Sequence, residues 1–128
     1  MKNNLIPMTI WLYGLSAAGK STLGEILFDW LLKRGYENIE LLDGEFLRSK
    51  LDRKYGYTLD EVVVYEENIA KIASSANSER GNHAIVCSMT HLESLRVFAR
   101  SQIENLYEIY LECDVPTCQN REYKDRYS

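Results

Sequence analysis

One segment of nine residues constrains the fold of this chain more than any other feature. Residues 14–22 read GLSAAGKST and come directly after the short apolar run Thr9–Tyr13. They match the pattern Gly-x-x-x-x-Gly-Lys-Ser/Thr, which binds phosphate when it joins a strand to a helix. Glycines let successive backbone N–H groups curve around a polyphosphate, and the next helix adds the positive end of its dipole. The sequence therefore predicts a strand, a phosphate-binding loop and a helix.

The fixed positions of this loop have expected roles. Lys20 should reach the β- and γ-phosphates of a nucleotide, and the Ser21 hydroxyl should ligate Mg²⁺. The alternative is an ordinary glycine-containing turn, which the complete match and the correct flanks disfavour. The residues of this loop assigned to the nucleotide are Gly14, Leu15, Ser16, Ala17, Ala18, Gly19, Lys20, Ser21 and Thr22.

Short apolar runs alternate with segments of helical period along the chain, as in parallel strands joined by crossover helices. Strands are expected at residues 9–13, 39–42, 84–87 and 107–111, and helices after the phosphate loop, near 58–81, at 92–105 and from 115 onward. In the second helix Tyr65, Ile69, Ile72 and Ala76 share one face, which should be buried. The predicted fold class is α/β, a P-loop NTPase-type three-layer αβα sandwich with a mainly parallel sheet, in a single domain over residues 1–128.

Composition disfavours several functions. The formal net charge is −4 and the 15 Lys and Arg residues are scattered, so general nucleic-acid binding is not expected. Cys87, Cys113 and Cys118 form no Cys-x-x-Cys pair, which disfavours a disulfide framework or a zinc site. No apolar run has the length of a signal peptide or membrane span, so a cytoplasmic protein without a membrane partner is expected.

Two carboxylates follow the second expected strand, which should lie beside the first. Parallel sheets bind ligands at the carboxyl ends of their strands, so Asp43 and Glu45 are candidates for catalysis together with Lys20. One carboxylate would orient Mg²⁺-bound water, with Asp43 and Ser21 as the metal site, and the other would accept the proton of an acceptor hydroxyl. A turn before a helix N-terminus is the alternative, because acidic residues also suit the helix dipole. Arg48 could hold an anionic acceptor or pair with Glu45, and spacing alone does not choose between them.

Together with three further motifs, these segments resemble the adenylylsulfate kinase family from about residue 9 to residue 127. The matching segments are GLSAAGKST at 14–22, LDGEFLR at 42–48, YGY at 55–57, ENI at 67–69 and REYKDRY at 121–127. The resemblance implies a kinase that transfers the γ-phosphate of MgATP to the 3′-hydroxyl of adenosine 5′-phosphosulfate, with ATP and Mg²⁺ as cofactors. The family is commonly dimeric, so a homodimer is one expected assembly.

The resemblance also implies individual roles. Glu45 would act near the 3′-hydroxyl, Tyr57 would stack on the acceptor base, and Arg121 and Lys124 would belong to a lid over the ATP phosphates. The acceptor-binding residues expected from these matches, and from the position directly after the third strand, are Glu45, Arg48, Tyr57, Asn68, Met89 and Thr90.

The sequence departs from the family around the acceptor. The family's second aspartate is Glu45, whose extra methylene moves the carboxylate outward. Tyr65 and Glu93 stand where the family has arginines, and bidentate arginine contacts supply both charge and geometry for an anionic acceptor. A changed acceptor is therefore a second possibility. The pair Ser88-Met89 after the third strand resembles the Ser-Met stretch of family members that phosphorylate cytidine diphosphoramidate in capsule decoration.

The carboxyl-terminal end of the sequence also differs from the family. The family continues beyond the lid with a helix and a last strand, whereas this sequence stops at Ser128. The alternatives to an active kinase are therefore a truncated chain and a catalytically weak nucleotide-binding protein. A small-metabolite kinase of the gluconate or shikimate type is a further possibility. Of the two histidines, His83 is expected in a surface loop, and His91 is a candidate for contacting the acceptor or handling a proton.

Overall fold

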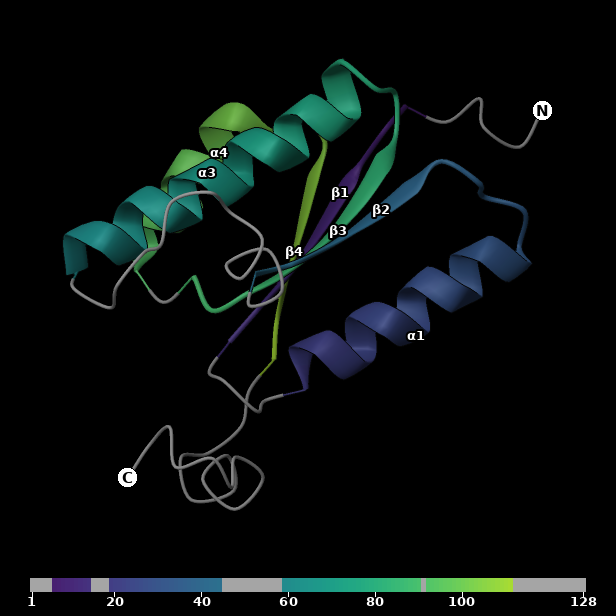
Figure 1. Cartoon of the computed structure of the whole chain (residues 1–128), viewed down its shortest axis with the longest axis horizontal. Helices are drawn as coiled ribbons and strands as arrows, with labels where there is room; N and C mark the ends of the chain where they lie inside the picture. Colours follow the sequence, from purple (N-terminus) through teal and green to yellow (C-terminus); the bar gives the residue numbers. More distant parts are fainter. Residues whose placement is uncertain (1–5, 15–18, 45–58, 91, 112–128) are drawn as a thin grey trace.

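The computed structural model describes residues 6–14, 19–44, 59–90 and 92–111. Their centre is a parallel sheet of four strands in the order β2-β3-β1-β4 (Figure 1). The strands are β1 (Thr9–Tyr13), β2 (Ile39–Asp43), β3 (His83–Ser88) and β4 (Leu106–Tyr110). All three strand pairings are parallel, so the carboxyl ends of the strands lie along one edge of the sheet.

The helices cover both faces of this sheet. Helix α1 (Lys20–Lys33) lies on one face, and α3 (Leu59–Ser78) and α4 (Glu93–Gln102) lie side by side on the other (Figure 1). The predicted α/β sandwich with a parallel sheet is therefore confirmed. Within the described ranges, no helix is both long and apolar enough to cross a membrane.

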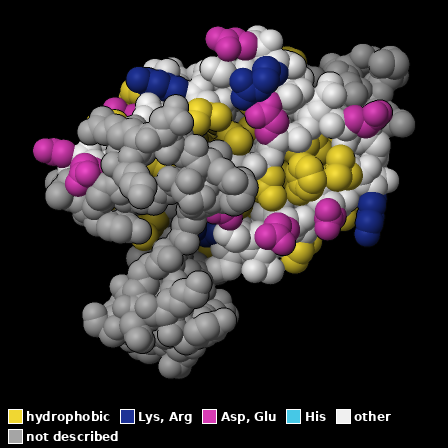
Figure 2. Space-filling model, in the orientation of Figure 1, with side chains coloured by type: hydrophobic (Ala, Val, Ile, Leu, Met, Phe, Trp, Pro, Cys, Tyr) yellow, Lys and Arg dark blue, Asp and Glu magenta, His cyan; other side chains and the backbone are white. Residues whose placement is uncertain are grey.

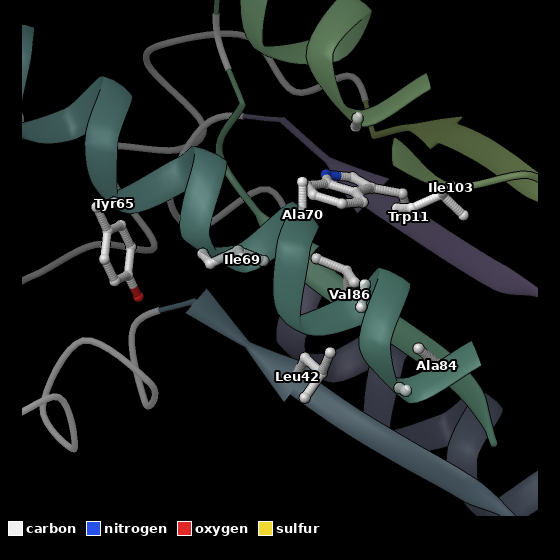
Figure 3. Packing of buried hydrophobic residues seen from close by; sticks show 11 residues of the cluster. Trp11, Leu42, Tyr65, Ile69, Ala70, Ala84, Val86 and Ile103 are labelled. Atoms are coloured by element: carbon white, nitrogen blue, oxygen red, sulfur yellow. The ribbon is translucent and has the colours of Figure 1, made fainter. Parts of the chain in front are cut away.

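Alternate residues of the central strands face two separate apolar cores. Leu12, Ile85 and Cys87 point toward α1, whereas Trp11 and Val86 point toward α3 and α4. This alternation follows from the two-residue period of a strand that is covered on both sides. Figure 3 shows Trp11 of β1 among Ala70 of α3, Val86 and Ile103 in the second core. β3 is buried along its whole length, which agrees with its unbroken apolar run.

The strand predictions are correct to within one residue at each end, and α4 is shorter than expected by one residue at its start and three at its end. The helix expected from residue 115 lies outside the described residues. Two expectations are wrong. β2 does not lie beside β1, because β3 is inserted between them. A crossover helix can carry the chain past a neighbouring position in the sheet, and spacing in the sequence does not show this.

His83 is the second wrong expectation, because it is not a surface-loop residue. It begins β3, it is 4% exposed, and its Nδ1 accepts a hydrogen bond of 3.1 Å from the Met8 backbone N–H. Its ring also meets the Tyr36 ring edge-on at 5.8 Å. Burial lowers the pKa of His83, since the charged imidazolium would lose its hydration there.

Polar groups around His83 hold the amino-terminal edge of the sheet together. The Asn77 side chain on α3 accepts from Thr9 Oγ1 at 2.7 Å and donates to the Met8 and Asn82 carbonyl oxygens at 3.2 and 2.7 Å. Arg80 Nε lies 2.6 Å from Glu40 Oε2 of β2. These bonds tie the end of α3, and Arg80 shortly after it, to β1, to β2 and to the residue that precedes β3.

Acid should destabilise the protein through His83. The unfolded chain binds a proton near pH 6.5, while the folded pKa is lower, so the unfolded state holds more protons between the two values. The free energy of unfolding is therefore expected to fall as the pH drops below about 6.5 and to level off below the folded pKa. Urea denaturation at several pH values from 8 to 5 measures this slope.

His83→Asn is the control, because its amide oxygen can accept from the Met8 N–H but does not titrate. The variant should show a shallower loss of stability over this range. Equal slopes in both proteins would contradict the assignment of a neutral, buried His83.

Candidate functional site

The predicted phosphate loop connects the carboxyl end of β1 to the amino terminus of α1. Gly19 adopts the left-handed conformation with φ of 104° and caps the amino terminus of α1. A side chain is strained in that conformation, which explains why the pattern requires glycine here. Lys20 and Ser21 form the first turn of the helix, so their side chains start where the helix dipole is positive. Residues 15–18 of the predicted loop lie outside the described residues.

The structure brings the first two sequence motifs into contact. Ser21 Oγ donates a hydrogen bond of 2.5 Å to Asp43 Oδ2. Asp43 is the last residue of β2, and β3 separates that strand from β1. The first turn of α1 therefore reaches across the end of β3. A hydroxyl oxygen and a carboxylate oxygen side by side are the hard oxygen ligands that Mg²⁺ prefers, so the pair fits the predicted metal site.

Close packing beneath α1 makes this reach possible. A β-carbon at Gly24 would clash with Cys87 Sγ, so only glycine lets the helix approach β3 this closely. Cys87 Sγ in turn donates to the Lys20 carbonyl oxygen at 3.4 Å. Burial raises the pKa of the Cys87 thiol to about 12, which leaves it protonated and suited to packing rather than to nucleophilic chemistry.

A second polar group lies at the end of β3. The Ser88 hydroxyl is 2.6 Å from both carboxylate oxygens of Glu66, and Thr90 Oγ1 is 3.2 Å from Glu66 Oε1. Glu66 comes from α3 and is only 7% exposed. Sequence reasoning singled out the neighbouring Glu67-Asn68 and missed Glu66. The available signal was that Glu66 lies three residues before Ile69, a helical spacing that places it beside the stripe predicted to be buried.

Arg96 and two tyrosines complete the described part of this edge. Arg96 of α4 donates through Nη1 to the Thr90 carbonyl oxygen at 2.8 Å, and its guanidinium lies 5.3 Å from the centre of the Tyr13 ring. The Tyr13 and Tyr110 rings are 5.2 Å apart at the ends of β1 and β4. Sequence reasoning singled out none of these three residues for the site, because an arginine on a helix and tyrosines at strand ends carry no motif.

The predicted residues are brought together only in part. Gly14, Gly19, Lys20, Ser21, Thr22 and Asp43 lie at the carboxyl edge, with Met89 and Thr90 directly after β3. Asn68 lies half-buried on α3. The candidates that lie outside the described residues are Leu15, Ser16, Ala17, Ala18, Glu45, Arg48, Tyr57, His91, Arg121 and Lys124.

The surface that is coloured in Figure 2 carries acidic side chains among patches of hydrophobic ones. Lys and Arg side chains lie apart from one another on this face and form no continuous basic stripe there. Helix α1 contributes Ile26 and Trp30 to the exposed apolar side chains of the described residues, and Arg34 lies 4.1 Å above the Trp30 ring.

The sheet is parallel, a phosphate-loop motif follows β1, and the carboxylate at the end of β2 accepts a hydrogen bond from the serine of that motif. This combination defines a P-loop phosphotransferase. The sequence profile of the adenylylsulphate kinase family matches residues 6–128. The chain therefore belongs to the adenylylsulphate kinase family.

Two curated relatives cover nearly all of this chain. It is 37% identical over 128 residues to the cytidine diphosphoramidate kinase of Campylobacter jejuni, covering 100% of this chain and 72% of the relative. It is 33% identical over 122 residues to the adenylyl-sulfate kinase of Microcystis aeruginosa, covering 94% of this chain and 65% of the relative. The names of the two relatives thus give different acceptors.

The fold is also that of a solved family member. The Mycobacterium tuberculosis APS kinase, solved in complex with AMPPNP and APS, superimposes with a TM-score of 0.79 at 24% identity. The match covers 94% of this chain and 69% of that one. At this identity the likeness concerns the fold alone.

Filling the contact between α1 and β3 should destabilise the protein. Gly24→Ala places a methyl group against Cys87 Sγ, and such overpacking costs about 1–3 kcal/mol, against about 1 kcal/mol gained in helix propensity. Cys87→Ala removes the opposing sulfur, so the double variant should be more stable than the two single effects predict. Chemical denaturation of all four proteins measures the coupling.

Asp29→Ala on the exposed side of α1 is the control for helix propensity alone. It should change stability little or raise it. Additive effects of Gly24→Ala and Cys87→Ala would contradict the close packing described above.

Proposed function

We propose that this protein is an ATP-dependent kinase that phosphorylates the 3′-hydroxyl of a nucleotide, with adenosine 5′-phosphosulfate as the first candidate acceptor. The contact between Ser21 and Asp43 is the observation that carries the proposal. It joins the phosphate loop to the end of β2 in a chain of the adenylylsulphate kinase family. The names of the relatives support the acceptor class, since both are kinases of nucleotide derivatives.

The described residues have distinct roles in this proposal. Backbone N–H groups at the start of α1, with the Lys20 ammonium, bind the β- and γ-phosphates of ATP. Ser21 and Asp43 hold Mg²⁺, which supplies charge neutralisation at the phosphates when it is bound. Asp43 also keeps the Ser21 hydroxyl aimed at the edge of the sheet. These groups position the nucleotide phosphates and stabilise their charge. Positioning and charge stabilisation account for most of the catalysis of phosphoryl transfer.

The roles assigned by resemblance remain proposals. Glu45 would accept the proton of the 3′-hydroxyl, Arg48, Tyr57 and Asn68 would bind the acceptor, and Arg121 with Lys124 would cover the phosphates. A homodimer is likewise proposed from the resemblance.

Cytidine diphosphoramidate is the second candidate acceptor. The observation that favours it is the 37% identity to the Campylobacter jejuni enzyme over the full 128 residues of this chain. The replacement of two expected arginines by Tyr65 and Glu93 points the same way, because it removes positive charge from an acceptor site that would bind a sulfate. Both candidates require the same transfer to a 3′-hydroxyl.

The protein should transfer phosphate from MgATP to one of these nucleotides. In separate reactions of MgATP with each acceptor, phosphorus NMR is expected to show a new 3′-phosphate on one of the two. Asp43→Asn should lower kcat on the order of 10²-fold, because the Ser21 hydroxyl and the metal lose their fixed carboxylate. Asp29→Asn makes the same chemical change on the exposed side of α1 and should leave kcat unchanged.

Each outcome has a clear meaning. A product from the adenylyl compound alone supports the first acceptor, and one from the cytidylyl compound alone supports the second. Binding of ATP without transfer to either nucleotide would contradict the proposed function in favour of a nucleotide-binding protein.

A further inference from the structure

Thr90, two residues after the end of β3, has a backbone conformation that is unfavourable for its type. Its φ is +44°, and it is the only non-glycine residue with a positive φ among the described residues. A β-branched side chain in the left-handed region is strained and persists only where surrounding contacts enforce it. Thr90 is 1% exposed, so these contacts come from the protein.

Three residues from three different elements hold Thr90. The Trp11 indole Nε1 of β1 donates to Thr90 Oγ1 at 2.9 Å, and Arg96 of α4 donates to the Thr90 carbonyl oxygen. Glu66 of α3 accepts from Thr90 Oγ1 and, at shorter distance, from Ser88 on the other side of the turn. The carboxylate of Glu66 therefore bridges the last residue of β3 and Thr90.

This turn is connected to the phosphate loop. The Gly14 backbone N–H, the first group of the loop, donates to the Met89 carbonyl oxygen at 3.3 Å. Met89 lies between Ser88 and Thr90, the two residues that Glu66 binds. Trp11, which donates to Thr90, belongs to β1 and lies three residues before Gly14. The hydrogen bonds of Thr90 are therefore connected to the loop through β1 as well.

Stability alone is a poor reason for a carboxylate in this place. Desolvating a buried carboxyl group costs free energy, and an apolar residue of similar size would fill the space without that cost. The hydrogen bonds instead enforce one strained turn at the edge of the sheet where parallel α/β proteins bind ligands. Strain maintained at such an edge is typical of groups that position a site.

We propose that Glu66 is a positioning residue that holds the Ser88-Met89-Thr90 turn in its strained conformation and thereby fixes the start of the phosphate loop. This inference rests on the proposed function, because the loop and the turn are the two sides of the nucleotide-binding edge. Without the carboxylate, the hydroxyls of Ser88 and Thr90 lose their shared acceptor, Thr90 relaxes toward negative φ, and the Met89 carbonyl turns away from Gly14.

Glu66→Ala should therefore impair catalysis more than folding. We expect kcat/KM to fall by about tenfold or more, because a small misplacement of positioned groups is costly in phosphoryl transfer. Glu66→Gln keeps one carbonyl acceptor and should recover part of the loss. In a Thr90→Gly background the backbone adopts positive φ without strain, so Glu66→Ala should cost less there than in the parent chain.

Glu40→Ala is the matched control. It removes a carboxylate that binds Arg80 and Asn82 at the opposite edge of the sheet, so it should lower the melting temperature while leaving kcat and both KM values unchanged. If Glu66→Ala behaves like Glu40→Ala, or if its effect is the same with Thr90 and with Gly at position 90, the positioning role is wrong.

A spectroscopic measurement separates this inference from the proposed function. The chain has two tryptophans, so Trp30→Phe leaves Trp11 as a single indole N–H signal in proton–nitrogen NMR. Glu66→Ala should shift this signal and speed its exchange with deuterium, whereas Glu40→Ala should not. An unchanged Trp11 signal in Glu66→Ala would overturn the inference even in an active kinase. A shifted signal, with weaker binding of a non-hydrolysable ATP analogue, would support it even if neither acceptor is phosphorylated.

Discussion

Strand β3 pairs in parallel with β2 on one side and with β1 on the other, and this pairing sets the geometry of the whole site. The register places Asp43 opposite Cys87, and Tyr13 opposite Ser88. The phosphate loop, the Asp43 carboxylate and the turn after β3 therefore start from the same edge. Since β3 is buried along its length, this register cannot slip without moving apolar side chains out of both cores.

Helix α1 brings residues from the start of the helix to the carboxylate at the end of β2. Its close approach to β3 at Gly24 and Cys87 lets the first turn pass over the end of that strand. Only then can Ser21 meet Asp43, two strand positions away from the strand that precedes the loop. The other face contributes differently, because α3 and α4 send Glu66 and Arg96 to the turn after β3. Helix α1 thus positions Ser21 beside Asp43, whereas α3 and α4 position the turn after β3.

Polar groups at the two ends of the sheet illustrate different physical uses of hydrogen bonding. Around His83, bonds from Met8, Thr9 and Asn77 satisfy backbone and side-chain groups where the strands begin, which is the usual requirement for buried polar atoms. Around Thr90, the bonds also hold a backbone conformation that the residue would not adopt by itself. The first network holds the starts of the strands together, whereas the second shapes the carboxyl edge of the sheet.

Local patterns in the sequence were enough to predict the helices, the strands and the family. The apolar runs, their spacing and the Gly-x-x-x-x-Gly-Lys-Ser pattern depend on preferences that the chain carries along its length. Lys20, Ser21 and Asp43 could be chosen as candidates from the sequence because each belongs to a motif. The position of β3 between β1 and β2, the burial of His83 and the meeting of Glu66 with Arg96 at Thr90 became visible only in the folded chain. Those features arise from contacts between residues far apart in sequence, and a strand order or a shared hydrogen bond leaves no local pattern from which it could be predicted.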